Sequence, residues 1–193
     1  MIFIDELKEA VNITLHPGTA TQKERSIRAA IAFYYKVLLV PLILYIILKL
    51  AIQNMTLGPF MPSPLLFAVI ALIVYPLLLL LWLLVSADLY QIFGKLFKVF
   101  NNPYSYTFTA TVYGAVPGAL LLWLLAFTNI VNPMLLDGIG IVAIIALIWE
   151  IIITIIALAN QQKTSRLRAF AVWLVATIVL MGVIIVFAVV LHV

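Results

Sequence analysis

Five long apolar stretches constrain this chain more than any other feature. They cover roughly residues 29–52, 64–87, 104–127, 139–159 and 169–191. A helix needs about 20 apolar residues to cross the hydrocarbon core of a bilayer, and it must pair its backbone polar groups within itself. The chain is 66% hydrophobic and only 9% charged, which excludes an ordinary soluble domain. We therefore expect an all-α integral membrane bundle of five transmembrane helices.

The basic residues between these stretches predict the orientation. Only Lys49 falls on the far side of the membrane. Nine fall on the other side: Lys8, Lys23, Arg25, Arg28, Lys95, Lys98, Lys163, Arg166 and Arg168. Because cytoplasmic loops carry the excess of Lys and Arg, we expect a multi-pass protein of the cell membrane, with the N-terminus cytoplasmic and the C-terminus outside. The net charge of +4 then reports topology, and we expect no nucleic-acid partner.

Two amphipathic segments are expected on the cytoplasmic side, in contact with the lipid bilayer. Residues 1–28 form an N-terminal segment that opens with an amphipathic helix over residues 1–15. Its Thr21–Glu24 reads as a capping box that starts the first membrane helix. Over Asp88–Asn102, polar residues recur every three or four positions opposite an apolar face, which is typical of a helix lying in the headgroup layer. The expected interfacial residues of that helix are Phe93, Lys95, Phe97, Lys98 and Phe100.

Residues that are costly near the bilayer midplane are candidate functional residues. Pro41, Pro76 and Pro117 lie near the middle of the first three spans, and each removes a backbone hydrogen bond. Glu150 lies at the same depth in the fourth span, where a charged carboxyl costs about 2.5–3.5 kcal/mol. Two interpretations stay open. One is a midplane polar site like those of transporters; the other is ordinary membrane-helix prolines with one interhelical hydrogen bond from Glu150.

Other polar and small residues lie in the inner halves of the spans. Lys36 either extends to the inner surface alone or pairs with Asp88. In the third span, Gly114 and Gly118 form a GxxxG motif, which lets two helices approach closely. The partner of this motif is either another span or a second copy of the chain, and the second case would give a homo-oligomer through the third span.

The sequence lacks the arrangements that are typical of enzymes. His16 and His192 fall on opposite sides of the expected membrane, and the chain contains no cysteine. We find no P-loop or HExxH motif and no nucleophile with a neighbouring base. We therefore expect a non-enzymatic protein without a metal or cofactor.

Three stretches resemble the Yip family of Ypt/Rab-interacting, five-span membrane proteins. They are Ala87–Phe97 (ADLYQIFGKLF), Tyr113–Pro117 (YGAVP) and Trp149–Ala169. The resemblance implies a short, prokaryotic-type Yip domain without enzymatic chemistry. Family members bind Rab-type GTPases through a long N-terminal region, whereas about 28 residues precede the first span here, which argues against GTPase binding.

Two functions follow from these features. The leading hypothesis is a Yip-type protein that acts by associating with lipid and protein, in membrane organisation or as a trafficking-like adaptor. The alternative is a small transporter or channel with a midplane polar site around Glu150. A solid bundle with in-plane helices would favour the first function, and a cavity that reaches Glu150 would favour the second.

Overall fold

The computed structural model describes residues 2–53, 70–122 and 136–192, and the regular structure of these residues is helical. Its elements are α1 (Ile2–Leu15), α2 (Pro17–Ala20), α3 (Ile27–Gln53), the π-helical turn η1 (Ile70–Val74), α5 (Tyr75–Leu96), α6 (Tyr104–Gly114), α8 (Leu136–Gln161) and α9 (Arg166–His192). Four helical stretches are long and apolar enough to cross a membrane: Ile27–Ile47, Leu72–Leu96, Gly140–Gln161 and Arg166–Val190. The chain is therefore compatible with a multi-pass membrane protein.

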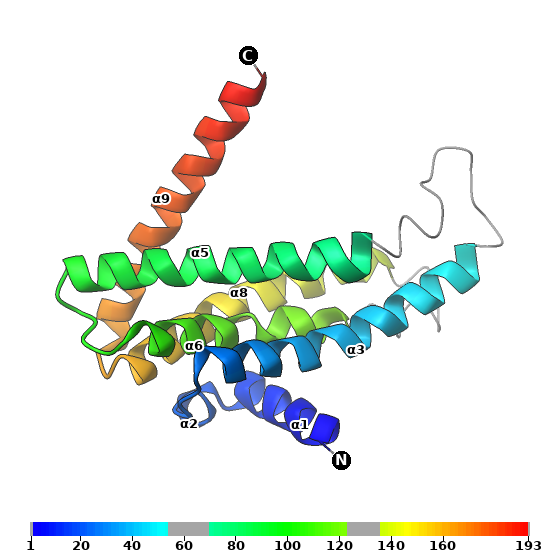
Figure 1. Cartoon of the computed structure of the whole chain (residues 1–193), viewed down its shortest axis with the longest axis horizontal. Coiled ribbons are helices and arrows are strands. Elements are labelled where there is room, and N and C mark those ends of the chain that lie inside the picture. Colours follow the sequence, from blue (N-terminus) through cyan, green and yellow to red (C-terminus); the bar gives the residue numbers. More distant parts are fainter. Residues whose placement is uncertain (1, 54–69, 123–135, 193) are drawn as a thin grey trace.

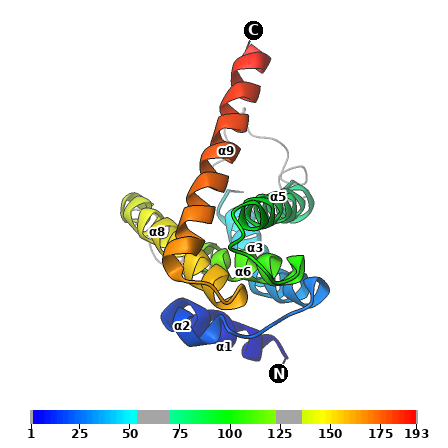
Figure 2. The ribbon, with the colours of Figure 1, turned by 90° about the vertical axis from the view of Figure 1, so that its left-hand side faces the viewer.

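Helices α3, α5, α6 and α8 lie side by side and form the body of the molecule (Figure 1). Helix α6 lies at the centre of this body, where it packs against α3, α5 and α8. Seen from the end, α8 lies to the left of α6 and α5 lies above it to the right, whereas the short helices α1 and α2 lie below (Figure 2). Helix α6 thus has different neighbours on different sides.

Helix α9 packs on the body mainly through its first turns. Its Val172 and Ala176 are buried where the helix contacts α5 and α8. Every residue from Met181 to Val190 is exposed, and this half of α9 projects away from the body (Figures 1 and 2). A helix that is apolar all round and has no protein around it requires lipid as its surroundings.

The third expected span is interrupted. Helix α6 ends at Gly114, Ala115 adopts a turn, and helix resumes over residues 116–122. Pro117 explains the break, because it has no N–H to donate and its ring crowds the carbonyl four residues earlier. Because of this break, the third expected span does not form one of the long helices among the described residues. Its expected end, residues 123–127, lies outside the described residues.

The other expected spans match the structure more closely. Helices α3, α8 and α9 cover the first, fourth and fifth expected spans, with Pro41 buried inside α3. The beginning of the second expected span, residues 64–69, lies outside the described residues. Pro76 does not interrupt that span, because it lies in the first turn of α5, where a missing N–H costs little.

No separate in-plane helix forms over Asp88–Asn102, so that expectation was wrong. Helix α5 continues without a break to Leu96 (Figure 1), and the chain then turns at Lys98, which has a positive φ of 56°. The turn folds Phe100 back onto Gly94, where a side chain on Gly94 would overlap the Phe100 ring. Phe100 is only 3% exposed and cannot face lipid, whereas Phe97 is exposed and Phe93 is partly buried against the core.

The N-terminal helix α1 forms as expected but packs on protein. Its Ala10 and Ile13 are fully buried in the core cluster. The expected capping box is not formed, because residues 23–26 are not helical and α3 begins at Ile27. Ser26 caps α3 instead, since its Oγ accepts a hydrogen bond of 3.2 Å from the N–H of Ala29.

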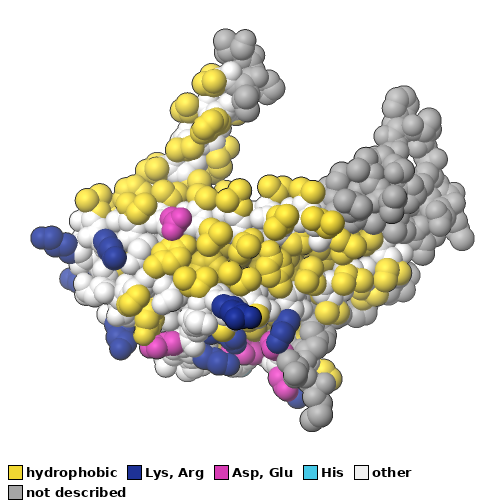
Figure 3. Space-filling model, in the orientation of Figure 1, with side chains coloured by type: hydrophobic (Ala, Val, Ile, Leu, Met, Phe, Trp, Pro, Cys, Tyr) yellow, Lys and Arg dark blue, Asp and Glu magenta, His cyan; other side chains and the backbone are white. Residues whose placement is uncertain are grey.

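Charged side chains are separated from a broad apolar surface (Figure 3). Lys and Arg side chains gather at one end of the body and along its lower edge in this view. That end contains the end of α5 and the turn between α8 and α9 (Figure 1), which contribute Lys95, Lys163 and Arg166. We call it the inner end.

Candidate functional site

Glu150 lies where α8 passes the break in the third helix. Its Oε1 accepts a hydrogen bond of 2.7 Å from the backbone N–H of Gly118. In an unbroken α-helix this N–H would donate to the carbonyl of Gly114, but the break at Ala115 and Pro117 releases it. The proline and the carboxyl therefore form one feature, in which the freed donor is satisfied by Glu150.

The GxxxG motif packs against α8 of the same chain. A Cβ atom on Gly114 would lie 2.9 Å from the Cβ of Thr154, and one on Gly118 would overlap Oε1 of Glu150. Only glycine leaves room for these contacts. The structure thus shows α8 as the partner of these two glycines. A homo-oligomer through the third expected span stays a prediction.

Two pockets meet at Glu150. The smaller, of about 130 Å³, lies among α5, α6, α8 and the start of α9, and its wall includes Ser86 and Thr111. The larger, of about 320 Å³, lies among α3, α5, α8 and residues 115–122, and its wall includes Tyr34 and Tyr75. Among the described residues that line either pocket, Glu150 is the only charged side chain.

Of the three midplane prolines, Pro117 lies at the helix break that frees the N–H of Gly118, and this N–H donates to Glu150. The carbonyl of Pro76 accepts a hydrogen bond of 3.0 Å from the hydroxyl of Tyr35, which ties α5 to α3. Pro41 is buried within α3. The three prolines therefore have three different local roles, and the structure does not gather them into a single polar site.

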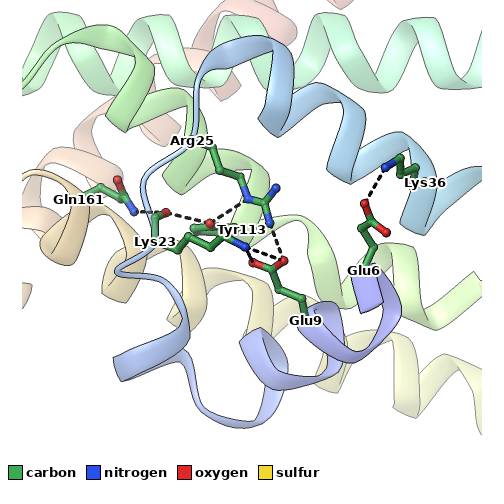
Figure 4. Close-up of polar contacts among 7 residues, drawn as sticks. All are labelled: Glu6, Glu9, Lys23, Arg25, Lys36, Tyr113 and Gln161. Atoms are coloured by element: carbon green, nitrogen blue, oxygen red, sulfur yellow. Dashed lines mark hydrogen bonds and ion pairs between the residues drawn. The ribbon is translucent and has the colours of Figure 1, made fainter. Parts of the chain in front are cut away.

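A second polar cluster joins the N-terminal segment to the body (Figure 4). Nη2 of Arg25 pairs with Oε2 of Glu9 at 2.6 Å, and Nε of Arg25 donates to the hydroxyl of Tyr113 at 3.1 Å. That hydroxyl donates to the carbonyl of Lys23 at 2.8 Å. The guanidinium of Arg25 also lies 4.3 Å from the ring centroid of Phe33, within the range of a cation–π interaction. Tyr113 thus holds the non-helical segment before α3 against α6.

The ion pair between Glu9 and Arg25 shifts both of its members toward their charged forms. Burial alone would raise the pKa of Glu9, but hydrogen bonds from Arg25 and Lys23 outweigh burial and hold this pKa below its usual value. Burial alone would lower the pKa of Arg25, but its bonds to Glu9 and Tyr113 outweigh burial and raise it. Both groups are therefore charged at neutral pH.

Two further contacts hold α1 in place. Lys36 pairs with Glu6 of α1 at 2.6 Å (Figure 4), so neither of the two alternatives for Lys36, a solitary charge or a pair with Asp88, describes it; Asp88 is exposed on α5. At the other end of α1, Nε1 of Trp149 donates to the carbonyl of Thr14 at 2.7 Å. Sequence reasoning missed this docking, because it placed α1 against lipid.

Buried amide side chains join the turns at the inner end. Gln91 donates to the carbonyl of Asn102 at 3.2 Å, and the Asn102 N–H donates to Oε1 of Gln162 at 3.0 Å. Nε2 of Gln161 donates to the carbonyls of Thr21 and Lys23 at 2.7 and 3.0 Å. Gln161 and Gln162 are each only 2% exposed. These bonds tie the α5–α6 turn, the α8–α9 turn and the N-terminal segment together.

The geometry separates a structural region from a candidate binding region. The inner end is held by paired charges and amides, whereas Glu150 lines two pockets with one hydrogen bond from the backbone. No protein-family model, no curated protein and no solved structure matches the chain. The resemblance to the Yip family stays a prediction based on the three stretches of sequence.

Proposed function

We propose that this chain is a small membrane transporter whose binding group is the carboxyl of Glu150. The observation that carries this proposal is that two pockets meet at the single charged side chain in their walls. Ionisable residues within membrane helices are expensive and commonly mark solute or ion pathways. The absence of the expected in-plane helix over residues 88–102 removes part of the support for the opposing scaffold hypothesis.

The structural role of Glu150 does not by itself require a carboxyl. A glutamine would accept the same bond from the Gly118 N–H without placing an ionisable group in lipid. A glutamate costs more free energy than a glutamine inside a membrane helix, and binding of a charged solute would account for this cost. Glu150→Gln is therefore a suitable variant, because it keeps the hydrogen bond and removes only the charge.

We infer a topology of five spans with the N-terminus cytoplasmic and the C-terminus outside. The four long apolar helices support four of these spans, and α6 with residues 116–122 supplies most of the third. The gathering of Lys and Arg at the inner end (Figure 3) supports its position in the cytoplasm. Glu150 lies near the middle of α8, and this topology puts it deep in the bilayer.

Carbodiimide labelling tests whether this site is reachable from the bilayer. Purified protein in lipid nanodiscs is treated with dicyclohexylcarbodiimide, which reacts with carboxyls in apolar surroundings, and the modified peptides are mapped by mass spectrometry. We expect Glu150 to be modified, and Glu150→Gln to lose that modification while keeping the elution volume and melting temperature of the parent. Lack of modification at Glu150 in the parent protein would remove the basis of the proposal.

The second candidate function is the Yip-type role in membrane organisation through lipid and protein association. It is favoured by exposed apolar side chains, which include Ile4, Val11 and Leu15 on α1 and Leu96 and Phe97 at the end of α5. Exposed Lys95 and Lys98 next to them suit anionic headgroups. If this function holds, the double variant Leu96→Ser/Phe97→Ser loses most liposome reshaping, and retained reshaping would contradict it.

A further inference from the structure

Aromatic side chains line the two pockets that share Glu150 in their walls. Trp82 lines both pockets; Tyr90 and Trp173 line the smaller pocket, and Tyr34 and Tyr75 line the larger. These residues come from α3, α5 and α9. Aromatic rings carry negative charge on their faces, and they attract cations that lie over them.

The negative charge in the pocket walls favours an occupant of positive charge. In the described walls the only formal charge is that of Glu150, so an anion would find no positive partner. A neutral solute would leave an ionised carboxyl without compensation in apolar surroundings. A monovalent cation balances Glu150 and gains from the aromatic faces as well.

The described walls also supply few of the oxygen ligands that calcium or magnesium takes. Calcium takes six to eight oxygen ligands and magnesium takes six, whereas one oxygen of Glu150 already accepts the Gly118 N–H. The remaining walls are mostly aromatic and aliphatic, with scattered hydroxyls. An organic cation, which brings its own apolar surface, needs no such shell of oxygen atoms.

The pocket volumes fit a molecule with a compact charge and a larger apolar body. The larger pocket, at about 320 Å³, falls within the range of cavities that hold drug-sized ligands, about 300–1,000 Å³. The smaller, at about 130 Å³, has room for a substituent or a few water molecules. The two pockets place the charge at Glu150 and the body beside Leu79 and Leu122.

From these features we propose that the solute bound at Glu150 is a lipophilic organic cation, whose positive centre pairs with the carboxyl and lies against Trp82. The inference rests on the transporter proposed above and names the class of its substrate.

Three probes that carry phenyl groups on one central atom test the charge requirement; the two ions have nearly equal shapes, and the neutral probe has an oxygen in place of one phenyl group. Tetraphenylphosphonium is cationic, tetraphenylborate is anionic and triphenylphosphine oxide is neutral. Binding to the protein in nanodiscs is measured by isothermal titration, with empty nanodiscs subtracted. We expect only tetraphenylphosphonium to bind and to protect Glu150 from the carbodiimide. Equal binding of all three probes would overturn the proposed class.

Variants test the two groups that recognise the cation. Glu150→Gln is expected to weaken tetraphenylphosphonium binding at least tenfold, and Trp82→Ala to weaken it about 2- to 30-fold. The matched control is Phe187→Ala, because Phe187 is an exposed aromatic residue of α9 that lines neither pocket. Unchanged binding in Glu150→Gln overturns the inference.

The same experiments separate the two proposals. If the carbodiimide modifies Glu150 but tetraphenylphosphonium neither binds nor protects it, the site stands and the substrate class is wrong. If the carbodiimide does not modify Glu150 at all, the proposed transport site is wrong together with the inference that rests on it.

Discussion

The inner end and the region around Glu150 place polar groups in apolar surroundings in opposite ways. At the inner end, Gln161 and Gln162 are almost fully buried, and each makes hydrogen bonds to residues distant in sequence. Among the described residues, the carboxyl of Glu150 has a single hydrogen-bond partner and two adjoining pockets. A network of hydrogen-bonded amides makes a unique structure rigid, although Oε1 of Gln161 is left without a partner in the described structure. A sparsely partnered ionisable group beside pockets suits a ligand. Burial of a polar group alone therefore does not identify a binding site; the adjoining pockets distinguish Glu150 from the buried amides.

The largest loss of stability is expected at Phe100, whose buried ring packs against Gly94. Phe100→Ala should lower the free energy of unfolding by about 3–5 kcal/mol, because it removes a buried aromatic ring and leaves a cavity beside Gly94. Phe97→Ala is the matched control, since Phe97 is 46% exposed, and it should change stability little. Unfolding in mixed detergent micelles measures both. Equal losses of stability in the two variants would contradict the burial of Phe100. They would favour the interfacial helix that was expected over Asp88–Asn102.

The next largest effect concerns the charged cluster. Arg25→Ala should cost about 2–3 kcal/mol, since it removes the partner of Glu9 and of the Tyr113 hydroxyl. Arg28→Ala is the control, because Arg28 is exposed. The chain has no cysteine, so spin labels placed through Ile4→Cys and Val40→Cys report the distance between α1 and α3. A narrow distance distribution that survives Arg25→Ala would show that the cluster does not hold α1.

A smaller effect is expected at the contact between the two regions. Gly114→Ala should cost about 1–3 kcal/mol by overpacking, because the new methyl group would overlap Thr154. Thr154→Ala removes that side chain and should recover part of the loss in the double variant. Unfolding of the four proteins in a double-mutant cycle gives the coupling. Additive losses would mean that Gly114 is not packed on α8.

The smallest effect is a dependence on pH at the ion pair of Glu9 and Arg25. The pKa of Glu9 is lower in the folded protein than its usual value of 4.5, so its contribution to stability is fully present above about pH 4.5 and is lost as the pH falls through the folded value. We expect the spin labels on α1 and α3 to separate only in acid. Glu9→Gln should abolish this transition, and a transition that persists in the variant would assign it to another group.

Several features of the fold follow from the sequence because they depend on local chemistry. The apolar length of α3, α8 and α9 predicts those helices. Pro117 predicts an interruption of the third expected span. The GxxxG motif predicts a close approach of helices at Gly114 and Gly118, but two glycines do not specify which helix approaches. Only the structure shows that the partner is α8.

Other features escaped prediction because they depend on the rotation and approach of whole helices. The repeat over residues 88–102 has the same period whether its apolar face meets lipid or protein, so the burial of Phe100 was not visible in it. The carboxyl of Glu150 was predicted as a candidate, but its aromatic walls were not. Trp82, Tyr34 and Trp173 lie far apart in the sequence, and nothing local to them indicates a shared pocket.

The bonds between Gln161 and the backbone of Thr21 and Lys23 span 140 and 138 residues of sequence. During translation, the segment before α3 leaves the ribosome long before Gln161 is made. The carbonyls of Thr21 and Lys23 therefore wait for this partner until α8 has been made, whereas the side chains of Lys23 and Arg25 can pair with Glu9 from the start. A contact that forms this late can stabilise the arrangement of the N-terminal segment, and it takes no part in the first steps of building it.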